Sequence, residues 1–309
     1  MEIIDIQNNT ELKTNIAATI GFFDGVHAGH RFLIEQLKRA AEMRNLPSAL
    51  ITFRRHPQTV LRPGDETALL NTLDERLSLL ASTGIDYCLL ADFSPELSQL
   101  DAKTFIHNVL RKQLSVSCLV IGYDHRFGKN RAEGFEEYLV YGSQCGIEVI
   151  PALEFSKEIH VSSTAIRRLL FQKKLEDANR LLTYDYSLEG IVVEGNKLGC
   201  KIGFPTANLE LLEPRKVIPS EGIYAVRVYV GGEPYGGMAY IGKRPTVAEN
   251  GEQSIEVNIF DFSGNLYGKT LRLEFVRYVR DDCRFDGIES LIEQLKKDKS
   301  NIQNILSKA

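Results

Sequence analysis

The sequence contains no tryptophan, only five cysteines and no surplus of positive charge. The cysteines are scattered and form no C-x-x-C pair, which argues against a disulfide framework or a zinc knuckle and fits a reducing compartment. With 41 acidic against 37 basic residues, the formal net charge is −4, so no broad surface for DNA or RNA is expected. No apolar run approaches the roughly 18 residues of a membrane span, and the first residues lack a basic-then-apolar signal. We therefore expect a cytoplasmic protein that binds neither nucleic acid nor membrane.

The length of 309 residues predicts two domains, and the first half has an α/β pattern. Short apolar runs alternate there with stretches whose apolar residues recur at helical spacing. The expected strands are 16–20, 49–53, 87–91, 118–122 and 147–151, and the expected helices are 30–44, 73–82 and 102–113. This alternation predicts a parallel, doubly wound sheet, which binds ligands at the carboxyl ends of its strands.

The second half has the pattern of an all-β domain. Its runs are rich in β-branched and aromatic residues, and Gly and Pro separate them at short intervals, which favours a small antiparallel barrel. The expected strands are 188–193, 224–230, 238–241, 255–262 and 271–279. A charged amphipathic stretch, 287–306, is expected to close the chain as a helix. We place the domains at 1–184 and 185–309.

A glycine-rich turn follows the first of these α/β strands. Residues 21–30 read GFFDGVHAGH, and a predicted helix comes directly after them. Strand, glycine turn and helix together bring backbone N–H groups to a phosphate, and His27 and His30 would face the same ligand. A turn with two surface histidines is the simpler alternative. Metal ligation is a third, although no carboxylate or cysteine cluster accompanies the pair.

A second polar segment, Ser162-Ser163-Thr164, precedes a predicted helix at 165–171. Hydroxyls and free N–H groups at a helix start suit phosphate oxygens, with Arg167 one turn further on. An ordinary helix cap is the better explanation of the three residues when they are taken alone. Beside the His27 turn, the phosphate-binding interpretation is favoured.

The second half has its own candidate phosphate loop at 195–208. Gly195, Gly199 and Gly203 alternate with two lysines, which makes a flexible cationic loop. Thr206 and Asn208 then offer a hydroxyl and an amide oxygen, both ligands that suit Mg²⁺. The alternative is a glycine-rich hairpin with a polar turn.

These segments occur in one order that resembles a known family. The string GFFDGVHAGH resembles the nucleotidyltransferase signature of the bacterial bifunctional riboflavin kinase/FAD synthetases. FRRHP at 53–57, GYDHRFG at 122–128 and VSSTAIR at 161–167 are similar to three further elements of that signature, with Arg55 in place of a Pro and His125 in place of a Phe. GFPTAN at 203–208 and EVNIFDF at 256–262 resemble the kinase half.

The resemblance implies a Rossmann-like nucleotidyltransferase domain followed by a riboflavin kinase-like barrel. It implies that Mg·ATP phosphorylates riboflavin to FMN in the barrel, and that a second ATP adenylylates FMN to FAD in the first domain. Riboflavin, FMN and ATP are then the small-molecule partners, Mg²⁺ the cofactor, and the chain a monomer or a weak homo-oligomer. A nucleotidyltransferase for another phosphorylated metabolite and a catalytically silent, flavin-sensing half are the alternatives.

The resemblance also implies roles for individual residues. His27, His30 and Glu256 are expected to be catalytic, with Glu256 as the base for the riboflavin hydroxyl. The expected nucleotide-binding residues are Gly21, Phe22, Asp24, Gly25, Gly29, His56, Ser162, Ser163, Thr164, Arg167, Gly195, Lys201 and Gly203. The expected flavin-binding residues are Asp124, Arg126 and Phe127, and the expected metal ligands are Thr206 and Asn208.

Overall fold

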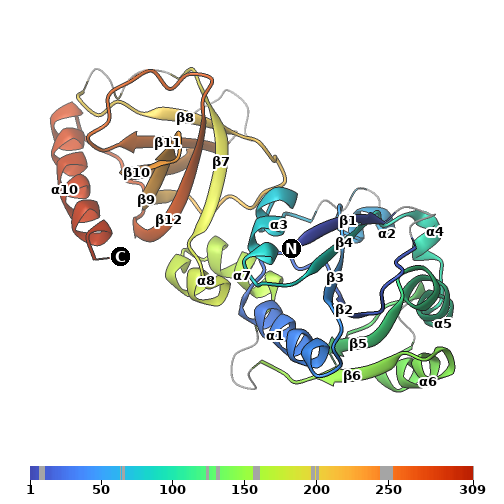
Figure 1. Ribbon diagram of the computed structural model, residues 1–309. Coiled ribbons are helices and arrows are strands. Elements are labelled where there is room, and N and C mark those ends of the chain that lie inside the picture. The colour runs from blue at the N-terminus through green and yellow to red at the C-terminus, as the bar shows by residue number, and fades with distance from the viewer. Residues whose placement is uncertain are drawn as a thin grey trace. The chain divides into compact units, whose positions relative to one another are not determined.

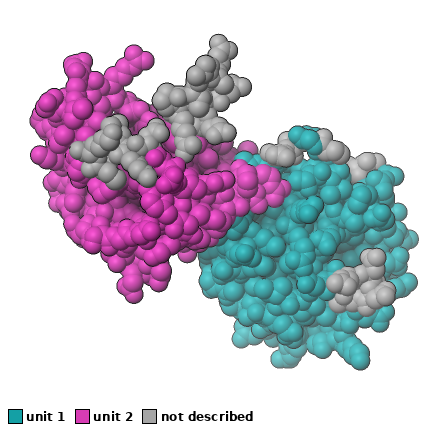
Figure 2. All heavy atoms as spheres, turned by 90° about the horizontal axis from the view of Figure 1, so that it is seen from above, with its two compact units in different colours: residues 1–163 teal, residues 164–309 magenta. Residues whose placement is uncertain are grey.

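The computed structural model divides the chain into two compact units, Met1–Ser163 and Thr164–Ala309 (Figure 2). It describes residues 1–6, 11–62, 64, 67–122, 125–129, 133–155, 161–195, 199, 202–243 and 253–308. The units divide at the start of helix α7 (Ser163–Phe171). The expected domain border near 184 falls later, between helix α8 (Leu175–Leu182) and the first barrel strand, and it stays a prediction.

The first unit is built on a six-stranded parallel sheet with the order β1-β4-β3-β2-β5-β6 (Figure 1). Its strands are β1 (Glu2–Ile6), β2 (Ile16–Ile20), β3 (Ser48–Phe53), β4 (Tyr87–Ala91), β5 (Val116–Gly122) and β6 (Glu148–Ala152). The chain winds outward in one direction from β2 to β4 and in the other from β5 to β6. The switch point therefore lies between β2 and β5, where such sheets bind their ligands. The strands expected from the sequence are present, whereas edge strand β1 was missed.

Helices cover both faces of this sheet, so the doubly wound architecture is confirmed. On β2, Ile16 and Ala18 belong to one apolar cluster and Ala17 to the other, because successive residues of a strand face opposite sides. The cluster with Ala17 includes residues of α1 (Ala28–Glu42) and α3 (Leu73–Ala81). The cluster with Ile16 and Ala18 includes residues of π-helix η1 (Phe105–Gln113) and α6 (Phe135–Cys145). Short helices α2 (Gln58–Leu61), α4 (Pro95–Ser98) and α5 (Ala102–Thr104) complete the unit.

The second unit holds a closed antiparallel barrel with the order β10-β11-β8-β7-β12-β9. Its strands are β7 (Tyr186–Val193), β8 (Ala207–Leu211), β9 (Gly222–Val230), β10 (Glu233–Lys243), β11 (Gln253–Ile259) and β12 (Thr270–Arg280). The predicted barrel is confirmed, and β8 is the one of these six strands that the sequence pattern does not indicate.

The predicted C-terminal helix is α10 (Ile288–Leu306), which packs on the outside of the barrel (Figure 1). Ile302 of α10 forms an apolar cluster with Ile223, Ala225 and Met238 from the strands beneath it. Within the described ranges, no helix of either unit has both the length and the apolar character that a bilayer crossing requires.

Candidate functional site

The turn after β2 has an unusual backbone that fixes the two candidate histidines. Gly25 has φ of 84°, and the non-glycine residues Phe23 and Val26 have φ of 59° and 35°. Such non-glycine conformations cost about 1–3 kcal/mol each and persist only where the surroundings hold them. The turn ends at His27, the N-cap of α1, whose Nδ1 accepts a hydrogen bond from the backbone N–H of His30 at 3.3 Å.

His27 and His30 lie face to face at this helix start. Their rings are stacked with centroids 3.6 Å apart and an interplanar angle of 14°. Burial, and secondarily the neighbouring His27, hold the pKa of His30 well below its usual value of 6.5. The His30 imidazole is therefore neutral at pH 7 without a ligand. Its Nδ1 is buried and has no hydrogen-bond partner among the described residues.

The carboxylate and the carbonyl of Asp24 both accept hydrogen bonds from other residues of the protein. The side chain is 3% exposed, and its carboxylate accepts hydrogen bonds from the backbone N–H groups of Leu70 and Asn71 at 3.0 and 3.1 Å. The carbonyl of Asp24 accepts a hydrogen bond from Ser163 Oγ at 2.8 Å. Asp24 therefore ties the histidine turn to the segment before α3 and to the first residue of α7.

The serine segment thus meets the histidine turn, and its expected contact with phosphate stays a prediction. A Cβ at Gly29 would lie 3.3 Å from the His27 ring and 3.8 Å from the carbonyl of Val161, so residues 161–163 pass close to the helix start. Ser163 begins α7, and Thr164 and Arg167 belong to the first two turns of that helix.

Arg76 supports the same turn, although it is not among the residues predicted from the sequence. This α3 side chain is 1% exposed and donates hydrogen bonds to the carbonyls of Phe22, at 3.1 Å, and Phe53. Its guanidinium carbon lies 4.0 Å from the centroid of the Phe22 ring. Burial lowers the pKa of Arg76 to about 10, and the nearby Asp24 charge opposes that shift. The available signal was a charged residue on the same helix face as the apolar Leu80.

A cavity of about 480 Å³ opens beside the turn. It is within the usual range of about 300–1,000 Å³ for small-molecule sites. Gly21, Phe22 and His56, expected to bind nucleotide, line it together with Arg126 and Phe127, expected to bind flavin. The His56 ring meets the Phe22 ring edge-on at 4.5 Å. The cavity lining that the structure describes includes no carboxylate, and Asp124 lies outside the described residues.

The second candidate site is a row of side chains across three barrel strands. Tyr240 of β10 is paired with Glu256 of β11, which is paired in turn with Asn208 of β8. Directly paired residues of antiparallel strands lie on the same face of the sheet. Thr206, just before β8, donates a hydrogen bond from Oγ1 to Glu256 Oε2 at 3.1 Å. The structure therefore brings the expected base and both expected metal ligands together.

The glycine loop reaches this row through Gly195. A Cβ there would lie 2.1 Å from Asn208 Nδ2, so only glycine leaves room for the amide. Gly203 has φ of 82°, which suits the turn before the Thr206 segment. Lys201, together with Lys197 and Cys200, lies outside the described residues.

The two units match two family models. The family described as FAD synthetase matches residues 9–165, and the family described as riboflavin kinase matches residues 182–306. A curated relative, the bifunctional riboflavin kinase/FMN adenylyltransferase of Listeria monocytogenes, is 36% identical over 95% of this chain and 93% of its own. The protein of the same description from Escherichia coli K12 is 38% identical over 91% of this chain and 90% of its own.

A solved structure also matches the whole chain. A crystal structure titled as a macrolide-efflux protein from Streptococcus pneumoniae has a TM-score of 0.88 and 31% identity, and the match covers 98% of this chain and 99% of that one. A nucleotidyltransferase-type parallel sheet and a flavokinase-type barrel in one chain define a two-domain class of flavin-metabolising enzymes. The chain belongs to the bifunctional riboflavin kinase/FMN adenylyltransferase family.

Proposed function

We propose that the barrel transfers the γ-phosphate of ATP to the 5′-hydroxyl of riboflavin, giving FMN. The first unit then transfers the adenylyl group of a second ATP to FMN, giving FAD and pyrophosphate. Family membership over both units supports the pair of reactions. The observation that carries the assignment is the presence of two separate constellations, the stacked histidines at a sheet switch point and the Glu256 row on the barrel.

Adenylyl transfer requires positioned donors more than it requires a base. The FMN phosphate is already ionised at neutral pH, so the barrier lies in orientation and in the charge that builds on phosphorus and the leaving group. His27 and His30 lie at the start of α1, where backbone N–H groups also attract anions. A phosphate beside His30 would raise its pKa again and favour the donating, cationic form.

The cavity supplies the flavin position in this proposal. Phe22 and Phe127 form apolar walls suited to a planar ring system, and Arg126 supplies positive charge for a phosphate. Phe127 is itself fixed, because it stacks on Tyr138 with centroids 4.1 Å apart. Ser162, Ser163, Thr164 and Arg167 remain the proposed contacts for the ATP phosphates.

Riboflavin phosphorylation is assigned to the Glu256 row. The carboxylate of Glu256 accepts the proton of the riboflavin hydroxyl, which is a poor nucleophile without such a partner. Because Thr206 donates its one proton to Glu256, its lone pairs remain available to a cation, and the amide oxygen of Asn208 lies on the same face. Hard oxygen donors of this kind fit Mg²⁺, which neutralises phosphate charge when bound. Gly195, Gly203 and Lys201 are the proposed polyphosphate contacts.

The setting of the enzyme also belongs to the proposal. We propose a domain border near residue 184, a monomeric or weakly homo-oligomeric state and a cytoplasmic location. Support for the location comes from the thiols: Cys88, Cys118, Cys145 and Cys283 are free in the described part of the chain.

The direct test is to incubate the purified chain with riboflavin, Mg²⁺ and ATP and to resolve the products by chromatography. FMN should form first and FAD after it. A second reaction that starts from FMN should give FAD without the kinase step. Formation of neither product contradicts the proposal, and FMN without FAD contradicts the assignment of the first unit.

A further inference from the structure

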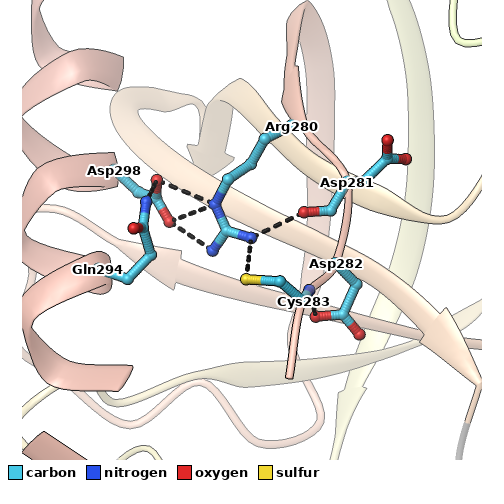
Figure 3. Close-up of polar contacts among 6 residues, drawn as sticks. All are labelled: Arg280, Asp281, Asp282, Cys283, Gln294 and Asp298. Atoms are coloured by element: carbon cyan, nitrogen blue, oxygen red, sulfur yellow. Dashed lines mark hydrogen bonds and ion pairs between the residues drawn. The ribbon is translucent and has the colours of Figure 1, made fainter. Parts of the chain in front are cut away.

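The C-terminal helix is fixed to the end of β12 by a two-pronged ion pair (Figure 3). Arg280, the last residue of β12, donates from Nη2 to Asp298 Oδ2 at 2.7 Å and from Nε to both carboxylate oxygens at 3.0 and 3.1 Å. Gln294, one turn earlier on α10, donates to Asp298 Oδ1 at 2.8 Å. The Asp298 side chain is 4% exposed, so this carboxylate is buried and fully engaged.

The other edge of the same guanidinium holds the segment that follows β12. Arg280 Nη1 donates to the carbonyl of Asp281 at 2.8 Å and to Cys283 Sγ at 3.4 Å (Figure 3). One planar group therefore joins helix α10 to residues 281–283. A lysine would carry the charge but lacks the fork that makes both sets of contacts.

Through Asp282, this segment contacts the Glu256 row of the barrel. Asp282 Oδ2 accepts a hydrogen bond from the Tyr240 hydroxyl at 2.9 Å, and Asp282 Oδ1 accepts one from the backbone N–H of Cys283 at 2.8 Å. Tyr240 is the cross-strand neighbour of Glu256. Burial and the Asp282 carboxylate raise the pKa of Tyr240 to about 12, so its hydroxyl stays a donor.

A role in stability alone explains this arrangement poorly. Asp298 and Ile302 are the buried residues of α10, and a buried ion pair often stabilises a fold no better than apolar residues of the same size. What the charged pair does, and an apolar pair could not, is to orient the backbone and side chains of residues 281–283 through directional hydrogen bonds.

We propose that Asp298 is a positioning residue for riboflavin phosphorylation. Through Arg280 it fixes residues 281–283, so that Asp282 holds Tyr240 in place beside Glu256. The inference rests on the function proposed for the barrel. It assigns to the C-terminal helix, which carries no candidate catalytic group, a part in shaping the kinase site.

The variant Asp298→Asn keeps the size of the side chain and removes its charge. We expect kcat/KM for riboflavin to fall by about 10- to 100-fold, the usual effect of a displaced reacting group. FAD formation from supplied FMN should equal that of the unmodified chain, which gives an internal control. The matched variant Glu293→Gln breaks the exposed pair with Lys297 on the same helix and should leave both activities unchanged.

A double-variant cycle separates positioning from folding. If Asp298 acts through Asp282 and Tyr240, adding Tyr240→Phe to Asp298→Asn should cause little further loss in kcat/KM for riboflavin, because both changes break one chain of contacts. A product of the two single losses would show that Asp298 acts independently of Tyr240 and would overturn the inference. So would an Asp298→Asn enzyme with unaltered riboflavin kinetics.

Arg280→Lys provides the same test if Asp298→Asn does not fold. It retains a cation opposite Asp298 and loses the contacts to residues 281–283. The kcat/KM for riboflavin should therefore fall, while the rate of FMN adenylylation should not change. Unaltered riboflavin kinetics in a folded Arg280→Lys chain would overturn the inference. If the unmodified chain forms no FMN, the proposed function and this inference both fail; if it forms FMN and these variants match it, only the inference fails.

Discussion

Replacement of Arg76 by lysine should destabilise the turn at residues 21–27 and leave the stability and activity of the barrel unchanged. Arg76 makes two charge-assisted hydrogen bonds, to the carbonyl of Phe22 in the turn and to that of Phe53 at the end of β3, and it lies over the Phe22 ring. These bonds come from the two terminal nitrogens of the guanidinium, and because a lysine has a single nitrogen we expect it to keep one of them. The lost bond is worth about 1.5–3 kcal/mol, and the altered cation–π contact adds about 0.5–1 kcal/mol. We therefore expect a local destabilisation of about 2–4 kcal/mol.

The effect should be visible in hydrogen exchange and in product formation. Because Arg76 holds the carbonyl of Phe22, the backbone amides of residues 21–27 should exchange faster by about 30-fold or more, the equivalent of about 2 kcal/mol. The rate of FAD formation from FMN should fall as the stacked histidines lose their fixed positions. Riboflavin phosphorylation by the same chain should not change.

Arg39→Lys is the matched control, since Arg39 is an exposed residue in the last turn of α1. It should alter neither exchange nor activity. The reasoning is refuted if Arg76→Lys exchanges like the unmodified chain in residues 21–27, or if exchange rises and FAD formation stays unchanged.

Three further predictions concern the two sites. Glu256→Gln should slow riboflavin phosphorylation by about 10²–10⁴-fold, the usual contribution of a general base, with adenylylation of FMN unchanged; a normal rate of FMN formation would exclude Glu256 as the base. Gly195→Ala places a methyl group against the Asn208 amide and should raise KM for Mg·ATP in the kinase reaction, measured by initial rates; an unaltered KM would argue against Asn208 as a metal ligand. The pKa of His30 is lower in the folded chain than its usual 6.5, so the unfolded chain binds the extra proton and stability should fall as the pH drops below 6.5. Thermal unfolding against pH checks this, and His30→Gln should flatten the slope; equal slopes would contradict the assignment.

Most of the fold was predictable because its strands are contiguous apolar runs. The exceptions have physical reasons. Strand β1 is a largely exposed edge strand, so its residues lack the buried pattern that marks a strand. Strand β8 begins directly after the Pro205–Thr206 segment, which has the composition of a turn. The stretch 102–113 is apolar at helical spacing but mostly forms a π-helix, whose wider turn the spacing does not distinguish.

The candidate sites were predictable where their residues are adjacent in the sequence. His27 and His30, or Thr206 and Asn208, form short recognisable strings, and the structure brings each pair together. Arg76 contacts the histidine turn from helix α3, and it lies 54 residues beyond Phe22, whose carbonyl it binds. Partners of this kind follow only from tertiary packing, and no local spacing indicates them.

The central claim is that two separate sites act in sequence on one flavin. The most direct measurement is the product profile of the His30→Ala chain supplied with riboflavin, Mg²⁺ and ATP. Since His30 belongs to the first unit and Glu256 to the barrel, FMN should accumulate at the unmodified rate and FAD should not form. Formation of FAD at the unmodified rate, or the loss of both products in a folded chain, would contradict the account.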